Sequence, residues 1–244
     1  MSRPYRWIVL LWASVPHNLR MKVMTMNPIY DYDIHIPTSL DSKKDYPVVF
    51  TLHGKGSNQK NMFGLVSPLA EDFILIGIRG NLPLGAGYQY YDLISLGNPK
   101  REMFDDAVKQ LVAFIEYATE KYPIDPRRRY VLGFSQGAIL AMTLALTMGG
   151  QLKGIAALNG YVPDFVKSEY PLRSVEDVSV FVSHGEFDSV FPVRIGHETA
   201  AYFKDQTPRL TFKLYPTDHG VSDENQLEVL EWLKRDVGNL SDEE

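Results

Sequence analysis

The sequence predicts a single α/β domain in which helices cover both faces of a mostly parallel, twisted sheet. Short apolar runs typical of buried strands alternate along the chain with amphipathic stretches of helical spacing. With 244 residues, of which 45% are hydrophobic and 23% charged, the chain is long enough to bury a sizeable core. No internal repeat, low-complexity tract or linker-like stretch divides it. We therefore expect one domain rather than two.

The strands are expected where apolar runs are short and bounded by turn residues. The first, 30–36 (YDYDIHI), alternates in polarity as a half-exposed antiparallel strand does. The runs 47–52 and 73–78 are apolar throughout, which is typical of strands buried on both faces. Four further strands are expected at 129–134, 154–158, 178–183 and 210–214.

Helices are expected at 101–122, 137–150, 193–204 and 223–236. The second, GAILAMTLALTMGG, is almost wholly apolar but shorter than the roughly 18 residues that cross a bilayer, so we expect a buried core helix. Residues 79–100 are expected to form a long loop. Its Tyr88, Tyr90 and Tyr91 would either border a cleft or pack the loop itself. The segment 160–177 is too short for a large cap domain.

Residues 1–20 are interpreted as an N-terminal extension and residues 21–244 as the domain. Arg3 and Arg6 precede the apolar stretch 7–15, which resembles a secretory signal. No small-x-small cleavage site follows Val15, so a cytoplasmic location is expected, with secretion as the alternative if residues 1–15 act as a signal.

Charge and cysteine content exclude several classes of function. The net charge of −5 gives no electrostatic reason to expect nucleic acid or an anionic membrane as a partner, and no stable membrane insertion is expected. The chain has no cysteine, which excludes disulfides, thiolate nucleophiles, iron–sulfur clusters and cysteine-based zinc sites. The oligomeric state is left open.

The most informative motif is GFSQG at 133–137, a G-x-S-x-G at the point where a strand is expected to turn directly into a helix. In this nucleophile elbow the serine backbone is strained and its hydroxyl projects above the sheet edge. Gly133 and Gly137 leave space for neighbouring backbone, and the helix start directs N–H groups toward an anion. Ser135 is therefore the candidate nucleophile.

A serine needs a base and a group that orients the base, and in this arrangement an acid and then a histidine follow in later post-strand loops. Asp188 follows the expected strand 178–183, and His219 follows 210–214. Glu186 is the competing acid. Asp218 is adjacent to His219 in sequence, which makes it poorly placed to orient the histidine ring.

The other histidines are less suitable bases. His17 lies outside the core pattern, and His35 lies in the first strand without a nucleophile nearby. His197 falls in an expected helix, while His53 and His184 end strands before glycine and are expected to shape turns.

The segment LHGKGSN at 52–58 follows a buried strand and matches a glycine-rich loop that offers an N–H to an oxyanion. We assign the two backbone donors to Lys55 and Gln136, and expect the Lys55 side chain to point to solvent. A phosphate-binding loop is the alternative, but the Gly-Lys-Ser/Thr ending is missing.

LHGKGSN, GFSQGA, HGEFDSVFP and DHGVS, in that order, resemble the phospholipase/carboxylesterase family of α/β-hydrolases, which includes acyl-protein thioesterases. The resemblance extends from about Met21 to the C-terminal helix and implies the α/β-hydrolase fold. It also implies a Ser135–Asp188–His219 triad with oxyanion donors at Lys55 and Gln136. The implied substrates are small-molecule carboxylic esters, thioesters or lysophospholipids, and no cofactor or metal is required. Lys55 stands where the family commonly has an apolar residue.

The sequence therefore predicts a serine hydrolase that cleaves carboxylic esters through an acyl-enzyme. A peptidase or acyltransferase using the same residues is one alternative. A catalytically silent ligand-binding protein on this fold is another.

Overall fold

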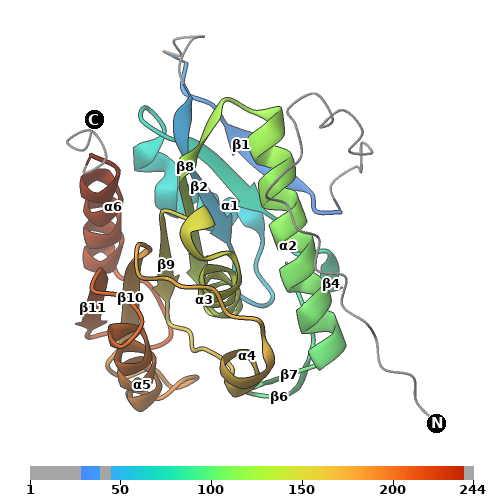
Figure 1. The fold of residues 1–244 in the computed structure, drawn as a ribbon. Coiled ribbons are helices and arrows are strands. Elements are labelled where there is room, and N and C mark those ends of the chain that lie inside the picture. The colour runs from blue at the N-terminus through green and yellow to red at the C-terminus, as the bar shows by residue number, and fades with distance from the viewer. Residues whose placement is uncertain (1–28, 39–44, 239–244) are drawn as a thin grey trace.

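The computed structural model describes residues 29–38 and 45–238. Its main sheet has seven strands in the order β1-β3-β2-β8-β9-β10-β11 (Figure 1). β1 pairs antiparallel with β3, and the other neighbours pair in parallel. The strands are β1 (Tyr32–His35), β2 (Tyr46–Leu52), β3 (Ile74–Ile78), β8 (Ile124–Phe134), β9 (Gly154–Leu158), β10 (Ser179–Gly185) and β11 (Leu210–Tyr215).

Helices cover both faces of this sheet, as the sequence predicts (Figure 1). They are α1 (Gln59–Val66), α2 (Arg101–Lys121), α3 (Gln136–Met148), α4 (Asp164–Glu169), α5 (Val193–Lys204) and α6 (Asp223–Gly238), with 3-10 turns η2 (Ser67–Leu69) and η3 (Gly149–Gln151). None of the helices in the described part of the chain is long and apolar enough to cross a membrane.

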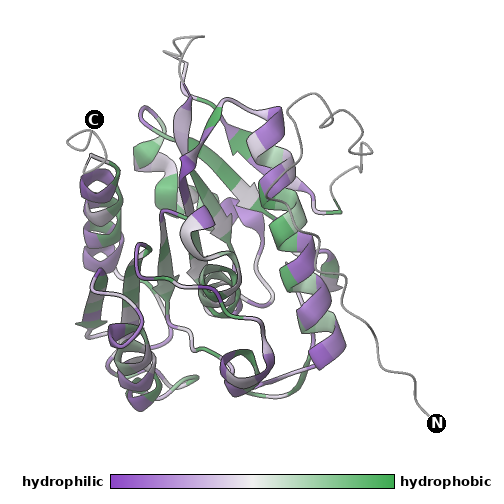
Figure 2. Cartoon of the chain, viewed as in Figure 1, coloured by the Kyte–Doolittle hydropathy of each residue, from purple (hydrophilic) through white to green (hydrophobic). Residues whose placement is uncertain are grey.

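Alternation along the buried strands divides the core into two layers. In β2, Val48 and Phe50 pack into the cluster that contains α2 and α3, whereas Val49 points to the opposite face, where α1 and α6 pack. Figure 2 shows the consequence for helix composition: α3 is apolar nearly all round, while α2 and α6 carry polar residues on their outer faces. The fold class predicted from the sequence is thereby confirmed.

The structure differs from the expected elements in four places. α1 and α4 were not expected. β8 begins five residues before the expected strand because Ile124 pairs with Tyr46 across a register shift in β2. The expected loop 79–100 contains two small hairpins, β4 (Leu82–Leu84) with β5 (Gly87–Gln89) and β6 (Leu93–Ser95) with β7 (Asn98–Pro99).

Two further sequence expectations have different outcomes. Tyr90 and Tyr91 are buried in the main core and do not border a cleft, so the packing interpretation is correct for them. The interpretation of residues 1–20 as an extension, and the expected boundary at residue 21, lie outside the described residues.

Candidate active site

Ser135 lies between the last residue of β8 and the first residue of α3, at the carboxyl edge of the sheet. Its backbone is strained, with φ 52° and ψ −113°. A Cβ on Gly133 would lie 2.1 Å from the Gly137 carbonyl oxygen, and a Cβ on Gly137 would lie 2.1 Å from that of Leu52. Any side chain at either glycine would therefore overlap backbone, which explains the G-x-S-x-G spacing physically.

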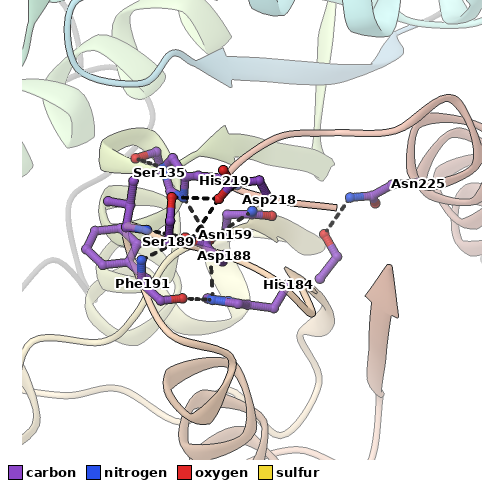
Figure 3. Close-up of polar contacts among 11 residues, drawn as sticks. Ser135, Asn159, His184, Asp188, Ser189, Phe191, Asp218, His219 and Asn225 are labelled. Atoms are coloured by element: carbon purple, nitrogen blue, oxygen red, sulfur yellow. Dashed lines mark hydrogen bonds and ion pairs between the residues drawn. The ribbon is translucent and has the colours of Figure 1, made fainter. Parts of the chain in front are cut away.

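His219 follows β11 and reaches the serine hydroxyl. Its Nε2 lies 2.8 Å from Ser135 Oγ, and its Nδ1 lies 2.8 Å from Asp188 Oδ2 (Figure 3). Because a carboxylate only accepts, Nδ1 carries the proton, and Nε2 is left to accept the Ser135 O–H. The ring packs against Phe134 and Phe191, with centroids 5.1 and 5.3 Å away.

Asp188 is the acid that the structure brings to His219. Its side chain is fully buried, and its Oδ1 accepts hydrogen bonds from the backbone N–H groups of Val190 and Phe191 at 2.8 and 2.7 Å. The competing Glu186 is exposed, and no hydrogen bond of its side chain to His219 is found among the described residues. The carboxylate environment thus favours Asp188 over Glu186.

Asp218 has a different contact with the histidine. Its Oδ1 accepts hydrogen bonds from the backbone N–H and hydroxyl of Ser189 and from the backbone N–H of His219. These donors lower the pKa of the Asp218 carboxyl. Asp218 therefore ties the acid loop to the histidine loop and does not touch the imidazole.

Among the described histidines, only His219 is hydrogen-bonded to Ser135. His53 Nε2 accepts the Gly80 N–H at 2.9 Å, and its Nδ1–H donates to the Gly54 carbonyl at 2.7 Å. Burial lowers the pKa of His53 to about 4, so the ring is neutral near pH 7. His53 shapes the turn after β2, as expected.

The remaining histidines bond elsewhere. His184 is buried at the end of β10 and donates through Nε2 to the Phe191 carbonyl. His35 contacts the Ala70 carbonyl, and His197 packs on the Phe212 ring. His17 lies outside the described residues.

The candidate oxyanion donors have free N–H groups beside the serine. Neither the Lys55 nor the Gln136 backbone N–H has an acceptor among the described residues, and Gln136 is the first residue of α3, where no intrahelical acceptor exists. Gly54 approaches the serine closely, since a Cβ there would lie 3.5 Å from Ser135 Cβ. The Lys55 side chain is exposed, as expected.

An open cleft of about 420 Å³ lies above these groups. It is lined by Gly54, Lys55, Ser57, Asn61, Met62, Phe134, Ser135, His219, Gly220 and Val221. Within the residues that the structure describes, no group of three or more His, Asp or Glu side chains is arranged to hold a metal ion. A hydroxyl, a base, a buried acid and two free N–H groups together can carry out acyl transfer.

Two contacts of the candidate site were not anticipated from the sequence. The Gln136 side chain accepts the Tyr90 N–H through Oε1 and donates to the Tyr91 carbonyl through Nε2, which ties the 79–100 segment to the elbow. Asn159, directly after β9, donates through Nδ2 to Asp188 Oδ2 at 3.1 Å. A polar residue at the carboxyl end of the strand next to β8 was the available signal.

The chain is similar to known proteins both in sequence and in structure. The family model described as Phospholipase/Carboxylesterase matches residues 38–235. The "Putative hydrolase MhqD" of Bacillus subtilis is 23% identical over 195 residues, covering 78% of this chain and 94% of that protein. Acyl-protein thioesterase 1 of Candida albicans is 27% identical over 160 residues, covering 61% and 68%. The crystal structure of the Bacillus cereus carboxylesterase superimposes with a TM-score of 0.75 at 21% identity, covering 91% of this chain and all of that one.

Proposed function

Because the chain belongs to the phospholipase/carboxylesterase family of α/β-hydrolases and is a carboxylic ester hydrolase, we propose that it cleaves its substrates through Ser135, His219 and Asp188. The observation that carries the proposal is the continuous hydrogen-bonded series from Ser135 Oγ through His219 to the buried Asp188, with 2.8 Å at each step. A buried carboxylate behind a histidine orients the ring and stabilises its protonated form.

The proposed reaction proceeds in two halves. His219 Nε2 takes the hydroxyl proton as Ser135 Oγ attacks the acyl carbon, and the resulting oxyanion is bound by the N–H groups of Lys55 and Gln136. The tetrahedral intermediate then collapses: the bond from the acyl carbon to the leaving oxygen or sulfur breaks, His219 protonates the departing alcohol or thiol, and the acyl group remains on Ser135 as an acyl-enzyme. Water, activated by the same imidazole, hydrolyses that ester and regenerates the serine.

The size and lining of the cleft favour a small substrate with an apolar part. Met62, Phe134 and Val221 supply apolar walls, and the volume of about 420 Å³ is near the lower end of small-molecule pockets. We therefore propose short-chain carboxylic esters as the preferred class. Thioesters are the second candidate, favoured by the similarity to a protein named acyl-protein thioesterase.

The test is hydrolysis of neutral p-nitrophenyl esters and matched thioesters graded by acyl length, together with labelling by a fluorophosphonate probe. Ser135→Ala is expected to fold and to lose about 10³-fold or more in kcat, and to lose the label, because the nucleophile is absent. Ser168→Ala makes the same change at an exposed position of α4 and should behave as wild type. A folded Ser135→Ala variant that keeps most of its activity would refute the proposed nucleophile.

A further inference from the structure

Among the described residues, two that are not glycine have positive φ: Ser135 at 52° and Asn159 at 55°. They follow β8 and β9, which are neighbouring parallel strands, so both strained residues lie at the same edge of the sheet. Asn is one of the few side chains that tolerates this backbone region. The strain at Ser135 belongs to the elbow. The strain at Asn159 has a separate structural consequence.

The backbone conformation of Asn159 directs its side-chain amide toward the Asp188 carboxylate. Its N–H donates to the Ser183 carbonyl of β10 at 2.9 Å, which fixes the residue between two strands. The fully buried side chain then donates through Nδ2 to Asp188 Oδ2 at 3.1 Å (Figure 3). A flipped amide would set its oxygen against the carboxylate oxygen, so the hydrogen-bond network assigns the orientation.

The contact falls on the carboxylate oxygen that orients the base. Asp188 Oδ1 is held by the backbone N–H groups of Val190 and Phe191, whereas Oδ2 accepts from His219 Nδ1 and from Asn159 Nδ2. The other ring near this oxygen is that of His184, whose Nε2 lies 3.5 Å away but donates to the Phe191 carbonyl at 2.7 Å. Without the Asn159 amide, His219 would be the sole hydrogen-bond donor to Oδ2 among the described residues.

We propose that Asn159 is a positioning residue for the ester hydrolysis described above, acting on His219 through the Oδ2 oxygen of Asp188. The amide fixes the plane of the carboxylate and takes up part of the charge on Oδ2. Asn159 thereby fixes the orientation of the His219 ring. It also sets how strongly the Asp188 carboxylate stabilises the protonated imidazole. The inference rests on the proposed triad.

A second observation separates this role from simple packing. Asn159 Oδ1 is buried and has no hydrogen-bond partner in the described part of the chain. An unpaired buried oxygen disfavours the folded state, so glycine, which adopts positive φ without strain, would be the better choice at this position if only the backbone turn mattered. The donated hydrogen bond to Asp188 gives a reason for an amide here.

The experiment compares Asn159→Gly with the wild type. Glycine adopts φ 55° without strain, so this variant removes the amide and leaves the backbone turn intact. We expect kcat on a neutral short-chain ester to fall about 10- to 100-fold with KM changed less than two-fold, the scale of one hydrogen bond to a charged group. The acid limb of the kcat profile should move to higher pH, because more negative charge on Oδ2 favours the protonated imidazole.

Asn159→Asp extends the test with a side chain of nearly the same size. It places a second carboxyl about 3 Å from Asp188 Oδ2, and because two carboxyls so close share one proton, the protonated group can donate its O–H to Oδ2 in place of the amide. Asn159→Asp should therefore keep more of the wild-type kcat and pH profile than Asn159→Gly does. The matched control is Asn225→Ala. Asn225 is equally buried and also has an unpaired Oδ1, but its Nδ2 donates to Ser183 Oγ and it does not contact Asp188. This control should lower the melting temperature and leave the pH profile in place.

Ser135→Ala is measured in the same assay and separates the two proposals. If it is inactive while Asn159→Gly matches the wild type in kcat and pH profile, the role of Asn159 is wrong and the triad stands. A loss in Asn159→Gly that leaves the acid limb unmoved, as in the Asn225 control, would also overturn the positioning role. If Ser135→Ala remains active, the proposed triad fails and the inference fails with it.

Discussion

The two sides of the candidate site are held by different kinds of interaction. On the nucleophile side, Ser135 is placed by backbone geometry: a positive φ, two glycines in contact with carbonyl oxygens, and the start of the buried helix α3. On the acid–base side, Asp188 and His219 lie in loops after β10 and β11 and are placed by hydrogen bonds from side chains and backbone N–H groups.

This difference determines how each side responds to change. Adding a side chain at a packed glycine should cause a large loss of stability, because the surrounding backbone in a packed core cannot shift enough to remove the overlap. Hydrogen bonds give a graded response that depends on charge and pH, because each donor can be lost separately. Changes at the packed glycines of the nucleophile side should therefore destroy the fold, whereas changes on the acid–base side should lower the rate and leave the fold in place.

The largest effect is expected from Gly137→Ala. Its Cβ would lie 2.1 Å from the Leu52 carbonyl oxygen, so β2 and α3 cannot both keep their places. We expect loss of more than about 4 kcal/mol of stability, or no soluble protein, with all activity lost. The control is Gly64→Ala on the exposed face of α1, where a Cβ meets nothing within 4 Å and alanine favours the helix. A Gly137→Ala variant with wild-type stability would contradict the steric account, and thermal unfolding measures both variants.

The next effect concerns the acid–base side. Asp188→Asn should cost about 10² to 10⁴ in kcat with the fold retained, because the ring of His219 loses its acceptor. Glu186→Gln changes an exposed carboxyl two residues away and should cost far less. Steady-state kinetics of the two variants give the ranking, and the reverse ranking would transfer the role to Glu186.

A smaller effect is expected on the pH dependence of stability, through the buried His53 ring in the turn after β2. Burial lowers the pKa of His53 from 6.5 to about 4, so between these pH values the unfolded chain binds a proton that the folded chain does not. His53 should therefore destabilise the fold as pH falls through this window, by on the order of 3 kcal/mol in all.

Urea unfolding at pH 7 and pH 4.5 measures this contribution. His53→Gln should reduce the pH dependence, whereas His197→Gln, at an exposed position on α5, should leave it unchanged. Equal pH slopes in wild type and His53→Gln would show that the ring is not held neutral by burial.

The smallest effect is expected from Lys55→Ala, which keeps the backbone N–H. Its kcat on a neutral short-chain ester should change by only a few-fold, while Lys55→Pro, which deletes the N–H, should cost about 10² to 10³ if the folded site is retained. Fluorophosphonate labelling checks that retention. A loss of 10²-fold or more in Lys55→Ala on the neutral ester would mean that the ammonium group takes part. A loss limited to anionic esters would make Lys55 a substrate contact at the cleft rim.

The same contrast explains what could be predicted from the sequence. The elbow depends on glycines at fixed spacing between a strand and a helix, so it can be recognised as a sequence motif at 133–137. Asp188 and His219 could be ordered because each follows a strand. Asn159 is visible in the sequence as a polar residue directly after a strand, but its contact with Asp188 joins residues 29 positions apart, and no local pattern marks that pairing.

The missed elements have similar causes. α1 has only eight residues, and its clearest signal is the N-cap Asn58, whose side chain accepts the Lys60 N–H. Tyr90 and Tyr91 lie in a segment of loop-like composition, yet their side chains pack in the main core, and the Gln136 side chain bonds to their backbone. These contacts join residues far apart in the sequence, so local composition does not reveal them.

The burial of α3 also determines the order in which the molecule opens. Every residue of α3 except Thr147 is buried, so its amides exchange with solvent only when the whole core separates. β11 is an edge strand with mostly half-exposed residues, so we expect it to open at a lower free energy. Such local opening would separate His219 from Ser135 while Ser135 remains in its strained turn. With the proposed triad, activity would then be lost before the core unfolds and would return on reclosure without refolding of the elbow.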